Sequence, residues 1–274
     1  MTTTQAQRGA VERLGAKALG GFRYIGGLSL LLASTLRWTL LGLFTRRVRL
    51  GRRALAEQLV RVGVRSLGIV VLVQLFIGVI LALQMTPPLR DPWRQEGMIP
   101  NIIGEAGFRM LGPILTAVVI TGFAGASIAA EIGTMVVAEE IEAMEAIALN
   151  PVRFLVVPRF WATFFSMILL SVVADLMIAL GGHLTALLVL GPTVYQGYWT
   201  RMQQQLSMRD FYTGLIQAGV FGTLISLIAC HEGLKVRGGA EGVGRATTMT
   251  VVYSIVAIIV SACLFTIVFY VYDL

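Results

Sequence analysis

The side chains best placed to do chemistry lie in one acidic stretch of an otherwise basic chain, residues 131–159. At about 100° per residue, its apolar side chains form a stripe on one side of a helix, with Glu139 and Glu142 opposite. The pattern predicts an amphipathic helix over about 134–149, which we expect Pro151 to end. Such a helix can seat its stripe in a partner's groove while its carboxylates meet basic residues there. The residues assigned to this docking helix are Val137, Glu139, Glu140, Ile141, Glu142, Met144, Glu145 and Ala148. The alternative is a solvated helix that lies on a membrane surface.

Two other places carry titratable side chains in apolar surroundings. Asp175 falls near the middle of a long apolar run, where a carboxylate marks a functional site by default. Its alternative role is structural, through a hydrogen bond to Ser171 one turn earlier or to a neighbouring helix. Residues 230–232 (Cys-His-Glu) are adjacent, but a metal site needs more ligands than this cluster offers, so we expect a structural role and no metal. No nucleophile–base–acid arrangement can be identified, so we expect no enzyme.

The composition is that of a membrane protein. The chain is 56% hydrophobic and 14% charged, whereas soluble domains carry roughly 25% charged residues. Uncharged or nearly uncharged runs of about 20 residues are long enough to cross a bilayer as helices. Five such spans are predicted: Ser66–Thr86, Met110–Ala130, Phe160–Leu190, Phe211–Cys230 and Ala246–Tyr272. The expected fold class is therefore an all-α integral membrane protein with a five-span domain over 66–274.

Residues 1–65 differ from the rest. They hold 12 of the 22 Lys and Arg residues, and the apolar run in Tyr24–Phe44 is interrupted by Arg37. We interpret Tyr24–Phe44 as a helix in the membrane interface, with a sixth span as the less favoured alternative. With the N-terminus inside, the inner segments hold 17 of the 22 basic residues. The positive-inside rule then predicts a cytoplasmic N-terminus and an outer C-terminus. The basic block indicates anionic headgroups rather than nucleic acid.

Several stretches resemble one family in order and spacing. They are EQLVRVGVRSLGIVVLVQLFIGVILALQ, LGPILTAVVITGFAGASIAAEIGTM, PRFWATFF and GGAEGVGRATTMTVVYS. Together they are similar to the MlaE/YrbE permeases, which are subunits of ABC transporters that move lipids with Mce proteins. The resemblance covers roughly residues 55–274, and it places the docking helix as the cytoplasmic coupling helix between spans two and three.

The resemblance implies a set of partners and a location. It implies a homodimer on two cytoplasmic ABC ATPase subunits, an Mce-domain lipid-binding protein on the outer side, and phospholipid as cargo; it also allows a small regulatory subunit on the ATPase. The location would be the bacterial inner membrane, with the C-terminus periplasmic. The chain contains no G-x-x-x-x-G-K-[ST] sequence. We therefore expect no cofactor on this chain, with ATP and Mg bound by the partner ATPase.

The resemblance also points to a lipid path and shows two departures. The matching path positions are Leu81, Gln84, Met85, Met110 and Leu111. Met110 stands where the family usually has Glu, and Phe123 stands where it usually has Arg. Losing both avoids an unpaired charge in the membrane. For the path positions, ordinary helix packing is an equally open interpretation.

Two functions of other kinds stay open. One is an ABC permease for a small polar solute, which would favour a more polar cavity than these spans offer. The other is a membrane-embedded enzyme of lipid metabolism, for which only Asp175, His183 and residues 230–232 are available.

Overall fold

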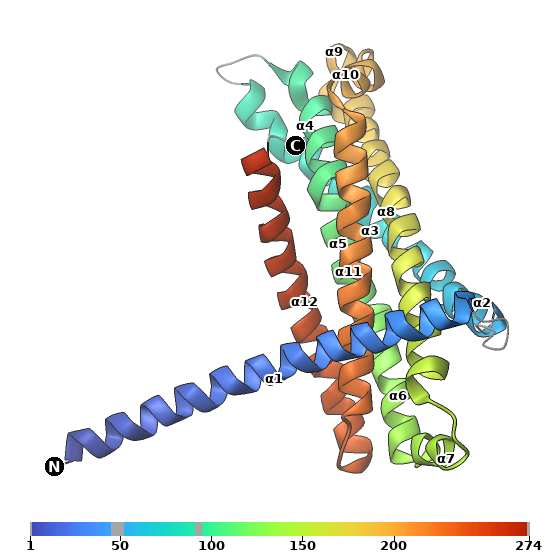
Figure 1. The fold of residues 1–274 in the computed structure, drawn as a ribbon. Helices are drawn as coiled ribbons and strands as arrows, with labels where there is room; N and C mark the ends of the chain where they lie inside the picture. Colours follow the sequence, from blue (N-terminus) through green and yellow to red (C-terminus); the bar gives the residue numbers. More distant parts are fainter. Residues whose placement is uncertain (1, 45–51, 91–94, 273–274) are drawn as a thin grey trace.

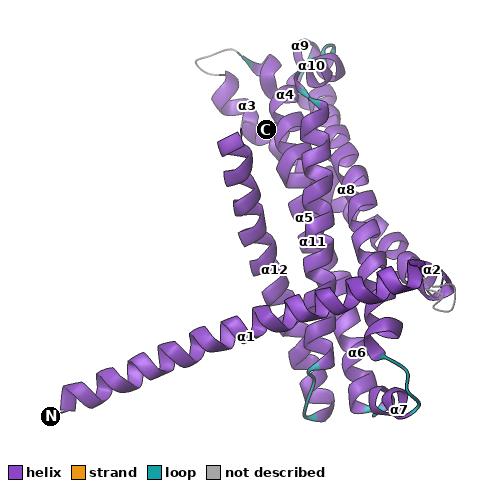
Figure 2. Cartoon of the chain, viewed as in Figure 1, coloured by secondary structure: helices purple, strands orange, loops and turns teal. Residues whose placement is uncertain are grey.

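The computed structural model describes residues 2–44, 52–90 and 95–272, which are helical apart from short turns and contain no strand (Figures 1 and 2). The α-helices are α1 (Thr2–Phe44), α2 (Arg52–Leu59), α3 (Arg65–Arg90), α4 (Ile99–Ala106), α5 (Gly112–Ile120), α6 (Ala126–Val137), α7 (Glu140–Ala146), α8 (Val157–Thr185), α9 (Pro192–Tyr195), α10 (Tyr198–Gln205), α11 (Met208–Leu234) and α12 (Gly239–Tyr272). A 3-10 turn covers Glu96–Met98. π-helical turns cover Val60–Val64, Gly107–Leu111, Thr121–Gly125, Val152–Val156 and Ala186–Leu190.

The five predicted spans all fall inside longer apolar helical segments. These segments are Arg53–Arg90, Glu96–Val137, Val152–Leu190, Met208–Leu234 and Gly239–Tyr272. The second segment is one helical rod in which two π-helical turns join α4, α5 and α6. A sixth segment, Leu19–Gly42, is also long and apolar enough to cross a membrane. All-helical architecture and multiple apolar segments of spanning length are therefore confirmed for the described residues.

The sixth segment belongs to α1, which runs across the bundle rather than along it (Figure 1). The ring of Tyr24 meets His231 of α11 edge-on, with ring centroids 5.1 Å apart. Fifteen residues later, Thr39 Oγ1 accepts a hydrogen bond of 3.0 Å from Trp161 Nε1 of α8. His231 lies in the last turns of α11 and Trp161 in the first turns of α8. Helix α1 therefore joins the ends of α8 and α11 that lie on the same side of the bundle.

The first and third spans make the closest helix contact in the bundle. A Cβ atom added at Gly78 of α3 would fall on the backbone carbonyl of Ile178 of α8, and one added at Gly181 would fall on the carbonyl of Leu75. Small residues let helix backbones approach this closely in membranes, where packing and hydrogen bonds must replace the hydrophobic effect. The buried Gln74 adds a side-chain bond, since its Nε2 donates to Thr116 Oγ1 of α5 at 3.0 Å.

Two apolar clusters fill the bundle. The larger one includes Val70, Ile120, Met167, Phe221 and Ile258, and it joins all five predicted spans. The second lies toward the C-terminal ends of α3 and α8, where α10 closes the bundle (Figure 1). Tyr198 of α10 is 1% exposed and its hydroxyl donates to the Ala179 carbonyl at 3.1 Å. Burial raises the pKa of the Tyr198 phenol above its ordinary value, so the phenol remains a neutral donor.

The glycine contact between α3 and α8 gives a direct test. We expect Gly78→Ala to lower the free energy of unfolding by about 1–3 kcal/mol, because the added methyl group meets backbone that cannot move aside. The matched control is Gly68→Ala in the same helix, where an added Cβ meets nothing within 4 Å. Thermal unfolding of the purified protein in detergent measures both. Equal melting temperatures for the two variants would contradict the close contact.

Candidate functional site

The acidic stretch folds as a short helix between two turns. Helix α6 continues to Val137, and α7 covers only Glu140–Ala146. Glu139 and Ala148 flank α7 in left-handed backbone conformations, with φ of 59° and 60°. The prediction of one continuous helix over 134–149 is therefore wrong. The left-handed residues explain the difference, since each ends a right-handed helix and redirects the chain.

Pro151 has a different role from the one predicted. The preceding helix ends at Ala146, and Ile147 follows as its cap. The side-chain oxygen of Asn150 accepts a hydrogen bond of 3.3 Å from the backbone N–H of Arg153. Asn150 and Pro151 thus begin the next helical segment, in the positions that Asn and Pro favour at helix starts.

The two faces of α7 are distinct. Ile141 and Met144 are half-buried, and Ile141 packs against the larger apolar cluster. The four predicted carboxylates all remain exposed: Glu139, Glu140, Glu142 and Glu145. At the ends of the predicted stripe, Val137 and Ala148 are exposed as well. The middle of the apolar stripe therefore packs α7 against the transmembrane core of the same chain. The acidic surface faces outward, and Ile147, which is 69% exposed, lies beside it.

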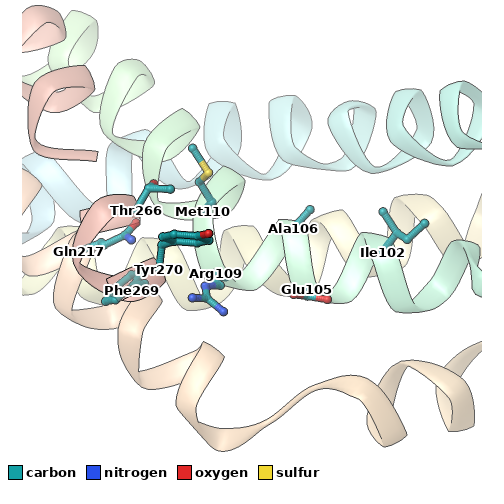
Figure 3. Close-up of a pocket in the computed structure, with 9 residues that line it drawn as sticks. All are labelled: Ile102, Glu105, Ala106, Arg109, Met110, Gln217, Thr266, Phe269 and Tyr270. Atoms are coloured by element: carbon teal, nitrogen blue, oxygen red, sulfur yellow. The ribbon is translucent and has the colours of Figure 1, made fainter. Parts of the chain in front are cut away.

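A cavity of about 370 Å³ opens at the other end of the bundle, between the α4–α5 rod, α11 and α12 (Figure 3). Its volume lies in the range of small-ligand sites. The lining residues are Ile102, Glu105, Ala106, Arg109, Met110, Gln217, Thr266, Phe269 and Tyr270. Most of this wall is apolar, with a few polar groups among it. Such a wall suits an amphiphilic molecule, whose apolar part needs no hydrogen-bond partner.

Charges near the cavity have both signs. The Arg109 guanidinium lies 3.5 Å from Asp210 Oδ1 and over the ring of Phe269, 5.3 Å from its centroid. Asp210 also accepts a bond from Ser207 and caps the start of α11. Glu105 brings a second, exposed carboxylate to the wall. One guanidinium against two carboxylates gives the rim no excess positive charge, so the site does not select for anions alone.

Only one of the five lipid-path candidates lines this cavity. Met110 projects into it and is 40% exposed (Figure 3). Leu81 and Met85 instead pack against the second apolar cluster. Gln84 is exposed, and Leu111 is half-buried outside the lining. The role of all five in a lipid path stays a prediction.

The sequence interpretation missed the polar residues of the cavity. Arg109 directly precedes the uncharged run that defines predicted span two, so the prediction leaves it outside the span although it lines the cavity. Gln217 is 2% exposed and its Oε1 has no hydrogen-bond partner among the described residues. The signal for Gln217 was present, because it is the one amide in the predicted span Phe211–Cys230.

Asp175 is buried, at 2% exposure, in the middle of α8. A Cβ atom added at Gly112 of α5 would fall on its Oδ1 atom, so the absence of a side chain there makes room for the carboxyl group. Within the described part of the chain, neither Asp175 Oδ1 nor Ser171 Oγ has a hydrogen-bond partner. The alternative of a stabilising bond to Ser171 is therefore wrong. A functional role for Asp175 stays a prediction.

The two departures from the family pattern lie far apart. Met110 and Phe123 occupy separate π-helical turns of the second segment. Thirteen residues at 1.5 Å each separate them by about 20 Å along the rod. A direct ion pair between the usual Glu and Arg could not form across that distance. Within one chain, the two replacements therefore do not remove the two partners of a single ion pair.

The third candidate cluster joins helices. His231 contacts Tyr24 of α1, and the Lys235 ammonium lies 5.5 Å from the centroid of the same ring. Across residues 2–44, 52–90 and 95–272, no group of three or more His, Cys, Asp or Glu side chains is placed to hold a metal ion. His231 therefore takes part in the packing of α1 against the bundle.

The fold and the site define a multi-pass helical membrane protein with an apolar cavity and a short acidic helix outside the bundle. Comparison with known proteins gives the family. The model of the family "Permease MlaE" matches residues 55–268, so the chain belongs to the MlaE permease family.

Relatives cover most of the chain. A probable ABC transporter permease protein of Rickettsia typhi is 37% identical over 210 residues, which are 77% of this chain and 80% of the relative. The intermembrane phospholipid transport system permease protein MlaE of Haemophilus influenzae is 32% identical over 246 residues, 89% of this chain and 91% of the relative. A probable ABC transporter permease protein of Synechocystis is 34% identical over 216 residues, 78% of this chain and 80% of the relative.

Proposed function

We propose that this chain is the permease subunit of an ABC transporter that moves phospholipid, or a related hydrophobic lipid, between the bacterial inner membrane and an Mce-domain partner. The observation that carries the proposal is the acidic surface at α7, a helix packed against the transmembrane core. Its exposed carboxylates are Glu140, Glu142 and Glu145 of the helix and Glu139 directly before it. A separate ATPase would grip this acidic surface with basic residues. The phospholipid cargo is supported by the Haemophilus influenzae relative, whose name states intermembrane phospholipid transport.

The proposed assembly is a homodimer with two cytoplasmic ATPase subunits. ATP and Mg would bind to the ATPases, since this sequence contains no phosphate-binding G-x-x-x-x-G-K-[ST] loop. In this proposal an Mce-domain protein lies on the outer side, and a small regulatory subunit on the ATPase is compatible with it. ATP-driven closure of the motor would displace α7 and the segment-two rod together, because a two-residue turn joins them.

The proposed orientation puts α7 and the N-terminus in the cytoplasm and the C-terminus in the periplasm. The bias of 17 inner basic residues out of 22 supports it. We assign α1 to the membrane interface because it touches the same-side ends of α8 and α11 through Thr39 and Tyr24. A helix that joins two span ends runs in the plane of the membrane. Its outward side carries apolar residues such as Phe22 and Leu30, at 75% and 73% exposure, which can face acyl chains.

The cavity supports a lipid over a small polar solute. Its wall combines Ile102, Met110 and Phe269 with the Arg109 guanidinium and the exposed Glu105. Apolar burial is worth about 0.8 kcal/mol per CH₂ relative to water, so a shielded apolar route keeps the cost of leaving the bilayer low. A zwitterionic headgroup matches a rim that carries both signs of charge. We propose Met110 as the position at which the path predicted from sequence enters this cavity.

The acidic surface of α7 provides the main test. We expect the doubly reversed variant Glu140→Lys with Glu142→Lys to lose co-purification of the ATPase, because it turns attraction at the docking surface into repulsion. The control is Glu57→Lys, which changes an exposed carboxylate paired only with the exposed Arg53 among the described residues. Pull-down of the tagged chain from native membranes measures bound ATPase, Mce protein and lipid together. Normal ATPase recovery with the double variant, or no ATPase with the unaltered chain, would refute the proposal.

The cavity provides a second test. We expect Met110→Trp to fill the cavity and to reduce phospholipid bound to the purified complex by about tenfold, which corresponds to about 1.4 kcal/mol. Leu72→Trp is the control, since Leu72 is 57% exposed, does not line the cavity and is not one of the predicted path positions. Binding is measured with a pyrene-labelled phospholipid at several lipid concentrations. Equal affinities in the two variants would show that lipid binds elsewhere.

A further inference from the structure

One carboxylate holds the inner ends of three spans together. Glu131 of α6 forms ion pairs with two arginines, one through each oxygen. Arg61, in the π-helical turn that precedes α3, pairs with Oε1. Arg159 of α8 pairs with Oε2, at 3.1 Å from Nη2. The first, second and third spans therefore meet at a single side chain.

The pairing with Arg159 is the buried half of this junction. The Arg159 side chain is 9% exposed, and its Nη1 donates to the Leu155 carbonyl at 2.9 Å. Its Nε atom has no partner among the described residues. Glu131 is thus the carboxylate that neutralises this guanidinium within the described structure. Taking away one member of a buried ion pair leaves a costly uncompensated charge.

The pairing with Arg61 is more open. The Arg61 side chain is 41% exposed and the Glu131 side chain 24% exposed. Solvent can therefore replace part of this contact if the helices separate. The two pairs differ in exposure, so Glu131 can stay paired with Arg159 of α8 while its contact with Arg61 changes.

The junction stands directly beside the acidic helix. Glu131 lies six residues before the end of α6 at Val137, and α7 begins at Glu140. Ile141 fixes α7 to the apolar cluster that also contains Ile128 and Ile132 of α6. A force applied to α7 therefore reaches the inner end of α6, where Glu131 is attached.

We propose that Glu131 is the joint that passes motion of α7 to the first and third spans, with Arg61 and Arg159 as positioning residues for transport. This inference rests on the proposed function, in which a motor acts on α7. The close glycine contact between α3 and α8 then carries the motion along both spans as one unit. Removing these ion pairs would leave the ATPase bound and active, but the first and third spans would no longer move with α7.

The test measures lipid moved per ATP hydrolysed. The transporter is isolated through the tagged chain and reconstituted in phosphatidylethanolamine–phosphatidylglycerol vesicles that contain a fluorescent phospholipid. We expect Glu131→Gln to keep ATP hydrolysis and to lower lipid moved per ATP by about tenfold, within the usual range of coupling between sites. The matched control is Glu57→Gln, which removes an exposed carboxylate outside the junction and should leave the ratio unchanged.

A second variant keeps the test decisive if Glu131→Gln does not assemble. Arg61→Gln leaves the buried pair between Glu131 and Arg159 in place, so we expect a folded complex whose lipid-to-ATP ratio falls by about fivefold, at the low end of that range. Arg61→Lys should restore much of the ratio. An unchanged lipid-to-ATP ratio in assembled Glu131→Gln or Arg61→Gln complexes would refute the coupling role of Glu131. The ion pairs would then serve only to stabilise the fold. A wild-type complex without ATP-dependent lipid movement would instead refute the proposed function.

Discussion

The close backbone contact between the first and third spans is the constraint on which the rest of the structure depends. In a bilayer, apolar side chains gain little by leaving lipid for protein, so helices associate where small residues let their backbones meet. Gly78 and Gly181 supply that contact. With α3 and α8 fixed against each other, Arg61 and Arg159 near their N-terminal ends can reach one carboxylate on the second span. The position of the acidic helix follows from that arrangement.

Polar groups in this bundle have distinct functions at different depths. At the end near α7, charges are paired and link spans. At mid-depth, Gln74 bonds to Thr116, while Asp175 occupies the space left by Gly112. At the far end, Arg109 and its neighbours form the rim of an apolar cavity. This division would suit the proposed transport of lipid, because a charge within an apolar route would have to be desolvated or paired during each passage.

The spans could be predicted from the sequence because an uncharged run of sufficient length has few alternatives in a membrane protein. The shape of the acidic stretch could not. Glu139 and Ala148 adopt left-handed backbone without being glycine, which no local pattern signals. The ion pairs of Glu131 could not be predicted either. Glu131 and Arg159 begin and end the acidic stretch and are 28 residues apart, so only the fold shows that they pair. The cavity depends in the same way on where α12 lies against the α4–α5 rod.

The central claim is that α7 is a cytoplasmic surface available to a motor, and its exposed neighbour Ile147 gives the most direct measurement. Ile147→Cys is introduced into a chain whose Cys230 and Cys263 are replaced by Ala, and a maleimide that does not cross membranes is applied from each side. The account predicts labelling in inverted inner-membrane vesicles, reduced labelling when the ATPase is bound, and none in intact spheroplasts. Labelling of intact spheroplasts would place α7 on the outer side and contradict the account.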